Sequence, residues 1–127
     1  MGSYNVDVDS VKNRMTLKLV GQLDKSEIAA VIDEVAEGAQ QLKEGWGLIN
    51  DISEFKPAAG DAEESLKEGA KEAGRLGMGT VVRVTGESMT AEFQWEQIGE
   101  EASSEEGYSV FKAETVEDAV ATLDEHQ

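Results

Sequence analysis

The sequence offers few side chains that could break a covalent bond. Its only histidine, His126, lies one residue from the C-terminus, where chain ends fray, so it is poorly placed to act as the base for a serine nucleophile. The chain contains no cysteine, which removes thiol nucleophiles, disulfides and thiolate metal sites. We therefore expect no catalytic residue, no metal site and no cofactor, and we expect that the protein is not an enzyme.

Two other patterns that could carry chemistry have simpler explanations. The glycine-rich segment Gly74–Gly79 leads from a predicted helix into a predicted strand, which is the reverse of the order that cradles a pyrophosphate. Glu100–Glu101 and Glu105–Glu106 are paired carboxylates, but neighbouring pairs arise by chance in a chain with 27 acidic residues. We interpret the first pattern as a helix end and the second as solvated surface.

Three larger side chains could instead contribute to binding. Arg83 lies within an apolar strand, where it either pairs with a carboxylate across the sheet, the favoured interpretation, or contacts an anion at the strand end. Phe93 and Trp95 are two residues apart in a predicted helix, so they cannot face the same way. We expect one of them to be partly exposed, either as part of a binding surface or packed against the last helix.

The charge balance excludes several classes of partner. The 27 acidic and 11 basic residues give a net charge of -16 and an isoelectric point near 4.2. The resulting field repels nucleic acids and anionic lipid surfaces.

Apolar runs are far shorter than the ~20 residues that span a membrane, so we expect no membrane insertion. The start of the chain lacks signal-peptide features, which predicts a cytoplasmic protein. Such acidity fits either a salt-rich cytoplasm or an ordinary acidic bacterial protein.

Hydrophobic spacing predicts five strands and four helices in a single domain, residues 1–127. The predicted strands cover residues 4–8, 15–19, 47–52, 80–84 and 108–112. The helices follow Asp24, Asp61, Ser88 and Thr115, and the first is expected to end near Gly45. We expect a polar break at residues 103–107 and a last helix that buries Val116, Ala119, Val120 and Leu123.

This order predicts an α/β fold with a single mixed β-sheet, an N-terminal antiparallel hairpin followed by parallel strands, flanked by four helices. Ligands of such sheets collect beyond the carboxyl ends of the parallel strands. The loops at residues 51–61 and 85–90 are therefore the regions expected to bind.

Three segments of the chain resemble a known family. Leu48–Ser53 at the end of a central strand, Val81–Gly86 and the terminal Thr115–Ala119 resemble a small stand-alone STAS-like domain, the family of sulphate transporters and anti-sigma-factor antagonists. The resemblance implies a non-enzymatic binding or switch module. Asp51 and Ser53 match part of the Asp-Ser-Ser/Thr-Gly motif whose hydroxyl is phosphorylated in the antagonists, but Glu54 and Phe55 depart from it.

The leading hypothesis is a regulatory or protein-interaction module that binds an unknown protein partner through loop 51–61 and the adjacent helix starts. Its candidate residues are Asp51, Ser53, Phe55, Thr85 and Ser88. The alternative is a carrier of a small apolar ligand or lipid in a pocket between sheet and helices, with candidates Met89, Phe93 and Trp95. The apolar stripe of the third helix could also support a homodimer.

Overall fold

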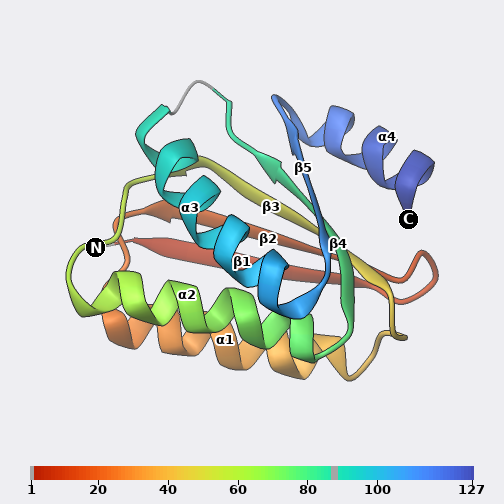
Figure 1. Cartoon of the computed structure of the whole chain (residues 1–127), viewed down its shortest axis with the longest axis horizontal. Helices are drawn as coiled ribbons and strands as arrows, with labels where there is room; N and C mark the ends of the chain where they lie inside the picture. The colour runs from red at the N-terminus through yellow and green to blue at the C-terminus, as the bar shows by residue number, and fades with distance from the viewer. Residues whose placement is uncertain (1, 87–88) are drawn as a thin grey trace.

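The computed structural model describes residues 2–86 and 89–127, which form one five-stranded sheet and four helices (Figure 1). The strands are β1 (Ser3–Asp9), β2 (Arg14–Gly21), β3 (Trp46–Phe55), β4 (Met78–Val84) and β5 (Ser109–Ala113). The helices are α1 (Lys25–Ala39), α2 (Asp61–Arg75), α3 (Met89–Glu106) and α4 (Val116–His126).

The sheet has the predicted mixed pairing. Strands β1 and β2 form an antiparallel hairpin, and β2, β3, β4 and β5 pair in parallel, so the spatial order of the strands is their order in the chain. Asp9 closes the hairpin turn, because its carboxylate accepts hydrogen bonds from the backbone N–H groups of Val11 and Lys12. Each parallel connection contains a helix, as a crossover between parallel strands requires.

The two faces of the sheet carry separate cores. Alternate side chains of β3 point to opposite faces: Leu48 belongs to the core beneath α1, α2 and α3, whereas Ile49 belongs to the core beneath α4. Figure 1 shows α1, α2 and α3 grouped together, with α4 apart from them. Strand β4 is covered on both faces, which explains why all but one of its residues are buried.

The capping box predicted for the first helix is confirmed. The Asp24 carboxylate accepts from the Glu27 N–H at 2.8 Å, and the Glu27 carboxylate accepts from the Asp24 N–H at 3.0 Å. The α-helix ends at Ala39, however, and does not continue to the predicted end near Gly45. Hydrogen bonds three residues apart, such as that from Leu42 N to Ala39 O, tighten this end of the helix.

The predicted break at residues 103–107 is wrong, because α3 runs through it to Glu106 and ends before Gly107 (φ +79°). Lys71 of α2 pairs with the carboxylates of Glu101 and Glu105, and Arg75 of α2 pairs with Glu106. These charges attach the end of α3 to α2, a tertiary effect that local polarity does not reveal.

Three smaller features also differ from the prediction: the end of β3, the start of α2 and the exposure of Val116. Strand β3 continues to Phe55, which shortens the predicted 51–61 loop to residues 56–60. Asp61 is the first residue of α2 and makes no side-chain cap. Thr115 caps α4 as predicted, but Val116 is 41% exposed because it belongs to the first turn, outside the buried face of Ala119 and Leu123.

Candidate functional site

The candidate surface lies at the carboxyl ends of the parallel strands. We use the name strand-end surface for residues 51–61, 85–86, 90 and 92–94. Backbone bonds join neighbouring strand ends here: Lys56 N donates to Gly21 O at 2.9 Å, and Thr85 N donates to Ala113 O at 3.1 Å. The parallel sheet therefore brings the two predicted loops to one edge of the molecule.

Asp51 and Ser53 are directly connected at this edge. Asp51 lies within β3 and is buried, and its Oδ1 accepts from Ser53 Oγ at 2.7 Å and from Ser53 N at 3.1 Å. Gly86 adopts a φ of +55°, and a Cβ built on it would lie 3.0 Å from the Ser53 Cβ. Ser53, near the end of β3, thus lies against Gly86, which follows β4. The Ser53 side chain itself is only half-buried.

The other predicted partner-binding residues are less accessible. Phe55 is 2% exposed and packs edge-to-face on Trp95, with ring centroids 6.0 Å apart. Thr85 is also buried. Ser88 lies outside the described residues. Among the predicted partner-binding residues that the structure describes, Ser53 is therefore the one whose side chain reaches the surface at this edge.

Sequence reasoning missed the residue that fixes the 56–60 loop. Gln94 is buried in α3, where its Oε1 accepts from Ala58 N at 2.8 Å and its Nε2 donates to Ala58 O at 2.9 Å. The same Nε2 donates to Glu63 Oε2 at 2.8 Å. The available signal was a glutamine adjacent to the apolar stripe of a helix, and that pattern does not distinguish a buried side chain that binds a loop from a solvated one.

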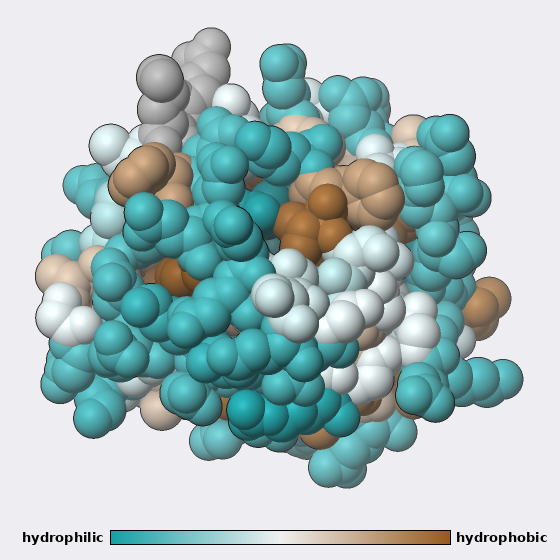
Figure 2. Space-filling view, viewed as in Figure 1, coloured by the Kyte–Doolittle hydropathy of each residue, from teal (hydrophilic) through white to brown (hydrophobic). Residues whose placement is uncertain are grey.

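Phe93 and Trp95 face different ways, as their spacing predicts. Phe93 is 64% exposed near the start of α3, whereas Trp95 is buried against the sheet. The side chain of Met89 lies outside the described part of the structure. The face shown in Figure 2 is mostly hydrophilic, with hydrophobic side chains visible in separate places. Phe93 is thus a large exposed apolar side chain on a strongly acidic protein.

Comparisons with known proteins agree with this architecture. No protein-family model matches the chain, and no curated protein sequence matches it significantly. An uncharacterised protein from Shewanella loihica PV-4, of the DUF3478 family with a SpoIIAA-like fold, has a similar structure, with a TM-score of 0.74 and 13% identity over 97% of this chain and 95% of that one.

Two anti-sigma factor antagonists are also similar in structure. SpoIIAA in its unphosphorylated form has a TM-score of 0.64 at 13% identity and covers 98% of this chain and 99% of its own. The antagonist from Mycobacterium paratuberculosis has a TM-score of 0.57 at 13% identity and covers 96% and 95%. The chain has a STAS-like fold.

Within this STAS-like fold, the surroundings of Ser53 are acidic. Its hydroxyl donates to Asp51, and the exposed carboxylate of Glu54 pairs with Lys18 Nζ at 2.8 Å. That hydrogen bond and the charge of Glu54 raise the pKa of Lys18. A phosphate on Ser53 would therefore lie beside the carboxylate of Asp51, which accepts the hydrogen bond of the Ser53 hydroxyl. The nearby cation, Lys18, is already paired with Glu54.

The favoured interpretation of Arg83, an ion pair across the sheet, is wrong for the residues that the structure describes. Its neighbours across the STAS-like sheet are Asn50 on β3 and Lys112 on β5, neither of which is a carboxylate. Arg83 is only 5% exposed. Burial lowers the pKa of its guanidinium, and the charge of Glu96 acts in the opposite direction.

A cavity lies between this sheet and helices α1, α2 and α3, with a volume of about 80 Å³. Trp95 lines it, whereas Phe93 points to solvent. Groups of three or more acidic or histidine side chains that could hold a metal ion are absent from the described ranges. Within those ranges, too, no helix is long and apolar enough to cross a bilayer.

Proposed function

We propose that the chain is a non-enzymatic regulatory or protein-interaction module that binds a protein partner through the strand-end surface. The fold supports this proposal, because two proteins that share it are named as anti-sigma factor antagonists, which act on another protein. The similarity of 13% identity concerns the fold, so the argument for binding depends on the surface itself.

The observation that carries the proposal is the exposure of Phe93 beside a fixed loop. Its side chain is 64% exposed, and the next residue along α3, Gln94, holds the 56–60 loop by two hydrogen bonds to Ala58. An aromatic side chain on a rigid surface loses little conformational entropy when a partner covers it. Phe93 has the properties of such an anchor.

Site-specific photo-crosslinking tests this proposal. A benzophenone amino acid at position 93 should crosslink in cells to a protein that mass spectrometry identifies. Val11 is the matched control, because it is 94% exposed and apolar but lies in the β1–β2 turn, at the opposite end of β2 from the strand-end surface. We expect a specific crosslinked species from position 93 and none from position 11.

Binding of the identified protein is then measured with purified components. Phe93→Ser should weaken binding at least tenfold, the loss of about 1.4 kcal/mol that removal of an interface anchor typically exceeds, whereas Val11→Ser should leave it unchanged. A crosslink to a second copy of this chain, with a dimer in light scattering, would identify the surface as a homodimer interface. Equal crosslinking from both positions, or none from position 93, would contradict the proposal.

A further inference from the structure

The core beneath helices α1, α2 and α3 contains three buried polar atoms without a hydrogen-bond partner in the described structure. These atoms are Asn50 Oδ1, Arg83 Nη1 and Trp95 Nε1, and the three side chains are only 3%, 5% and 8% exposed. The other tryptophan differs, because Trp46 Nε1 donates to Leu76 O at 3.1 Å. Buried polar atoms without partners weaken the packing that encloses them, since they have lost their hydrogen bonds to water.

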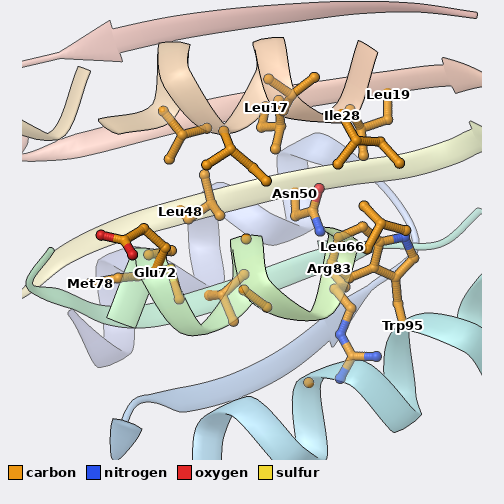
Figure 3. A pocket seen from close by; sticks show the side chains of 18 of the residues that line it. Leu17, Leu19, Ile28, Leu48, Asn50, Leu66, Glu72, Met78, Arg83 and Trp95 are labelled. Atoms are coloured by element: carbon orange, nitrogen blue, oxygen red, sulfur yellow. The ribbon is translucent and has the colours of Figure 1, made fainter. Parts of the chain in front are cut away.

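Two of these residues belong to the contact between α3 and the sheet. Trp95 is part of α3, and Figure 3 shows the guanidinium of Arg83, on β4, directed toward this helix. A Cβ on Gly99 of α3 would lie 3.2 Å from Arg83 Nη2, closer than such contacts usually are. The helix therefore encloses the guanidinium with a glycine, which adds no apolar side chain to the interface.

The enclosed guanidinium keeps its positive charge. Burial lowers its pKa, but an arginine starts so high that it does not lose its proton in a protein. The carboxylates of Glu92 and Glu96 act on it through their fields, and Glu92 itself pairs with Lys112 at 3.0 Å. Enclosing a cation without a contacting anion costs free energy, so the charge of Arg83 opposes the packing of α3 over it.

The cavity of about 80 Å³ lies in the same region. Trp95 and Gly99 of α3 line it, together with Leu48 and Val81 of the sheet. Side chains that border a void lack partner atoms on that side and lose part of their dispersion attraction. The middle of α3 is therefore held to the sheet less firmly than a fully packed helix would be.

Contacts near its two ends hold α3 in place. Near its start, Gln94 makes two hydrogen bonds to Ala58. Near its end, Glu105 pairs with Lys71 at 3.3 Å, but the Glu105 side chain is 50% exposed, and salt screens such pairs. Gly107 follows the helix, and a Cβ there would meet nothing within 4 Å, so the backbone has room to turn at this residue. These contacts can be released without disturbing the strands.

We propose that α3 is a lid that opens from the sheet as one unit while the strands and α1, α2 and α4 stay folded. In the open form, water reaches Arg83 and Trp95 and pairs their polar groups. The closed form predominates because opening also exposes the buried apolar side chains of Ile98 and Ala102. Opening uncovers a cation on a protein whose net charge is -16. This device is separate from the proposed docking at Phe93 and does not depend on it.

Native-state hydrogen exchange of the full chain, followed by nuclear magnetic resonance at increasing urea concentrations, tests this proposal. The amides of α3 should exchange through one shared opening, about a hundredfold more populated than the opening that exposes the amides of α1. Helix α1 is the internal reference, because it covers the same face of the sheet and carries a capping box. The urea dependence of the α3 opening should lie between zero, as for fraying ends, and that of global unfolding, because a lid exposes part of the core.

Two arginine variants test the physical cause of the opening. Arg83→Met removes the enclosed charge and keeps a long apolar side chain, so it should lower the population of the open form about tenfold. Arg14→Met is the matched control, because Arg14 is also largely buried but pairs with Asp124 of α4, on the other face of the sheet. It should leave the α3 opening unchanged. If Arg83→Met does not fold, the comparison of α3 with α1 in the unaltered chain still decides.

Three outcomes would overturn the proposal. Exchange of the α3 amides through the same opening as the α1 amides would mean that the helix separates only when the whole core unfolds. An open population that is unchanged or larger in Arg83→Met would mean that the charge does not oppose closure. Faster exchange of the Trp95 indole hydrogen than of the α3 amides would mean that water enters the cavity while α3 is closed and pairs its polar atoms.

Discussion

Tyr108 shows at the residue scale how the cavity wall affects titration. It lines the cavity and is only 7% exposed, and burial raises the pKa of its hydroxyl to about 12. The nearby charge of Arg83 acts in the opposite direction, because it favours the phenolate. The folded protein thus holds a proton on Tyr108 at pH values where the unfolded chain, with an ordinary tyrosine pKa near 10, releases it.

This difference predicts a loss of stability in alkaline solution. Because the folded pKa is raised, the contribution of Tyr108 is fully present below pH 10 and is lost as the pH rises toward 12, a change of about 3 kcal/mol in the free energy of unfolding. Urea unfolding from pH 9 to 12 measures it. Tyr108→Phe should reduce the slope in this window, and Tyr4→Phe, at a more exposed tyrosine, should reduce it less. Identical slopes for the unaltered chain and Tyr108→Phe would contradict the prediction.

Single residues were the hardest part of the site to predict. The spacing of Phe93 and Trp95 was sufficient to predict that they face different ways, because helix geometry fixes that relation. The surroundings of Arg83 were not predictable, since its neighbours Asn50 and Lys112 are determined by strand register and lie far away in sequence. Gln94 was missed for the same reason, because its partner Ala58 lies in the 56–60 loop, far from α3 in sequence.

At the scale of elements, the clamp between α3 and the 56–60 loop has a measurable consequence. Gln94→Ala leaves both backbone groups of Ala58 without their partner, which should lower the free energy of unfolding by about 2 kcal/mol. The amide of Ala58 should also exchange faster with solvent. Gln97→Ala is the matched control, because Gln97 is an exposed glutamine of the same helix.

Urea unfolding and amide hydrogen exchange check this prediction together. A loss of stability without faster exchange at Ala58 would mean that Gln94 packs in the core without fixing the loop. Faster exchange with both variants would point to a general effect on α3.

Element boundaries were predictable wherever a local signal sets them. The capping box of Asp24 and Glu27 and the cap at Thr115 are local hydrogen bonds, and both are present as the sequence indicates. The end of α3 was mistaken, because its last turn is held by ion pairs with Lys71 and Arg75 of α2. Local polarity predicted a break, and tertiary contacts maintained the helix.

At the scale of the whole molecule, the alternation of strands and helices along the chain made the class of fold predictable. It did not make the residues of the cavity predictable. Residues 47–52 contain a short apolar run beside Asn50 and Asp51, which indicates a buried central strand, and the helices between strands require parallel crossovers. The same sequence does not say which helix covers which face. That assignment places α1, α2 and α3 together, and only then do Asn50, Arg83 and Trp95 meet at one cavity.

The net charge of -16 belongs to the whole molecule and predicts strong dependence on salt. Self-repulsion among carboxylates destabilises the compact state, and the screening length falls from about 10 Å at 0.1 M salt to about 3 Å at 1 M. The Tm should therefore rise by about 5 °C or more between dilute buffer and molar NaCl, since for a domain of 127 residues about 4 °C corresponds to 1 kcal/mol.

A charge-reversal variant distinguishes this screening from a general effect of salt on hydrophobic burial. Glu37→Lys, Glu100→Lys and Glu125→Lys change three exposed glutamates that make none of the described ion pairs. The triple variant should melt higher than the unaltered chain in dilute buffer, and its Tm should rise less with NaCl. Parallel salt curves for the two proteins would attribute the stabilisation to hydrophobic burial. A Tm that does not change with salt would mean that the acidic surface is no adaptation to a salt-rich cytoplasm.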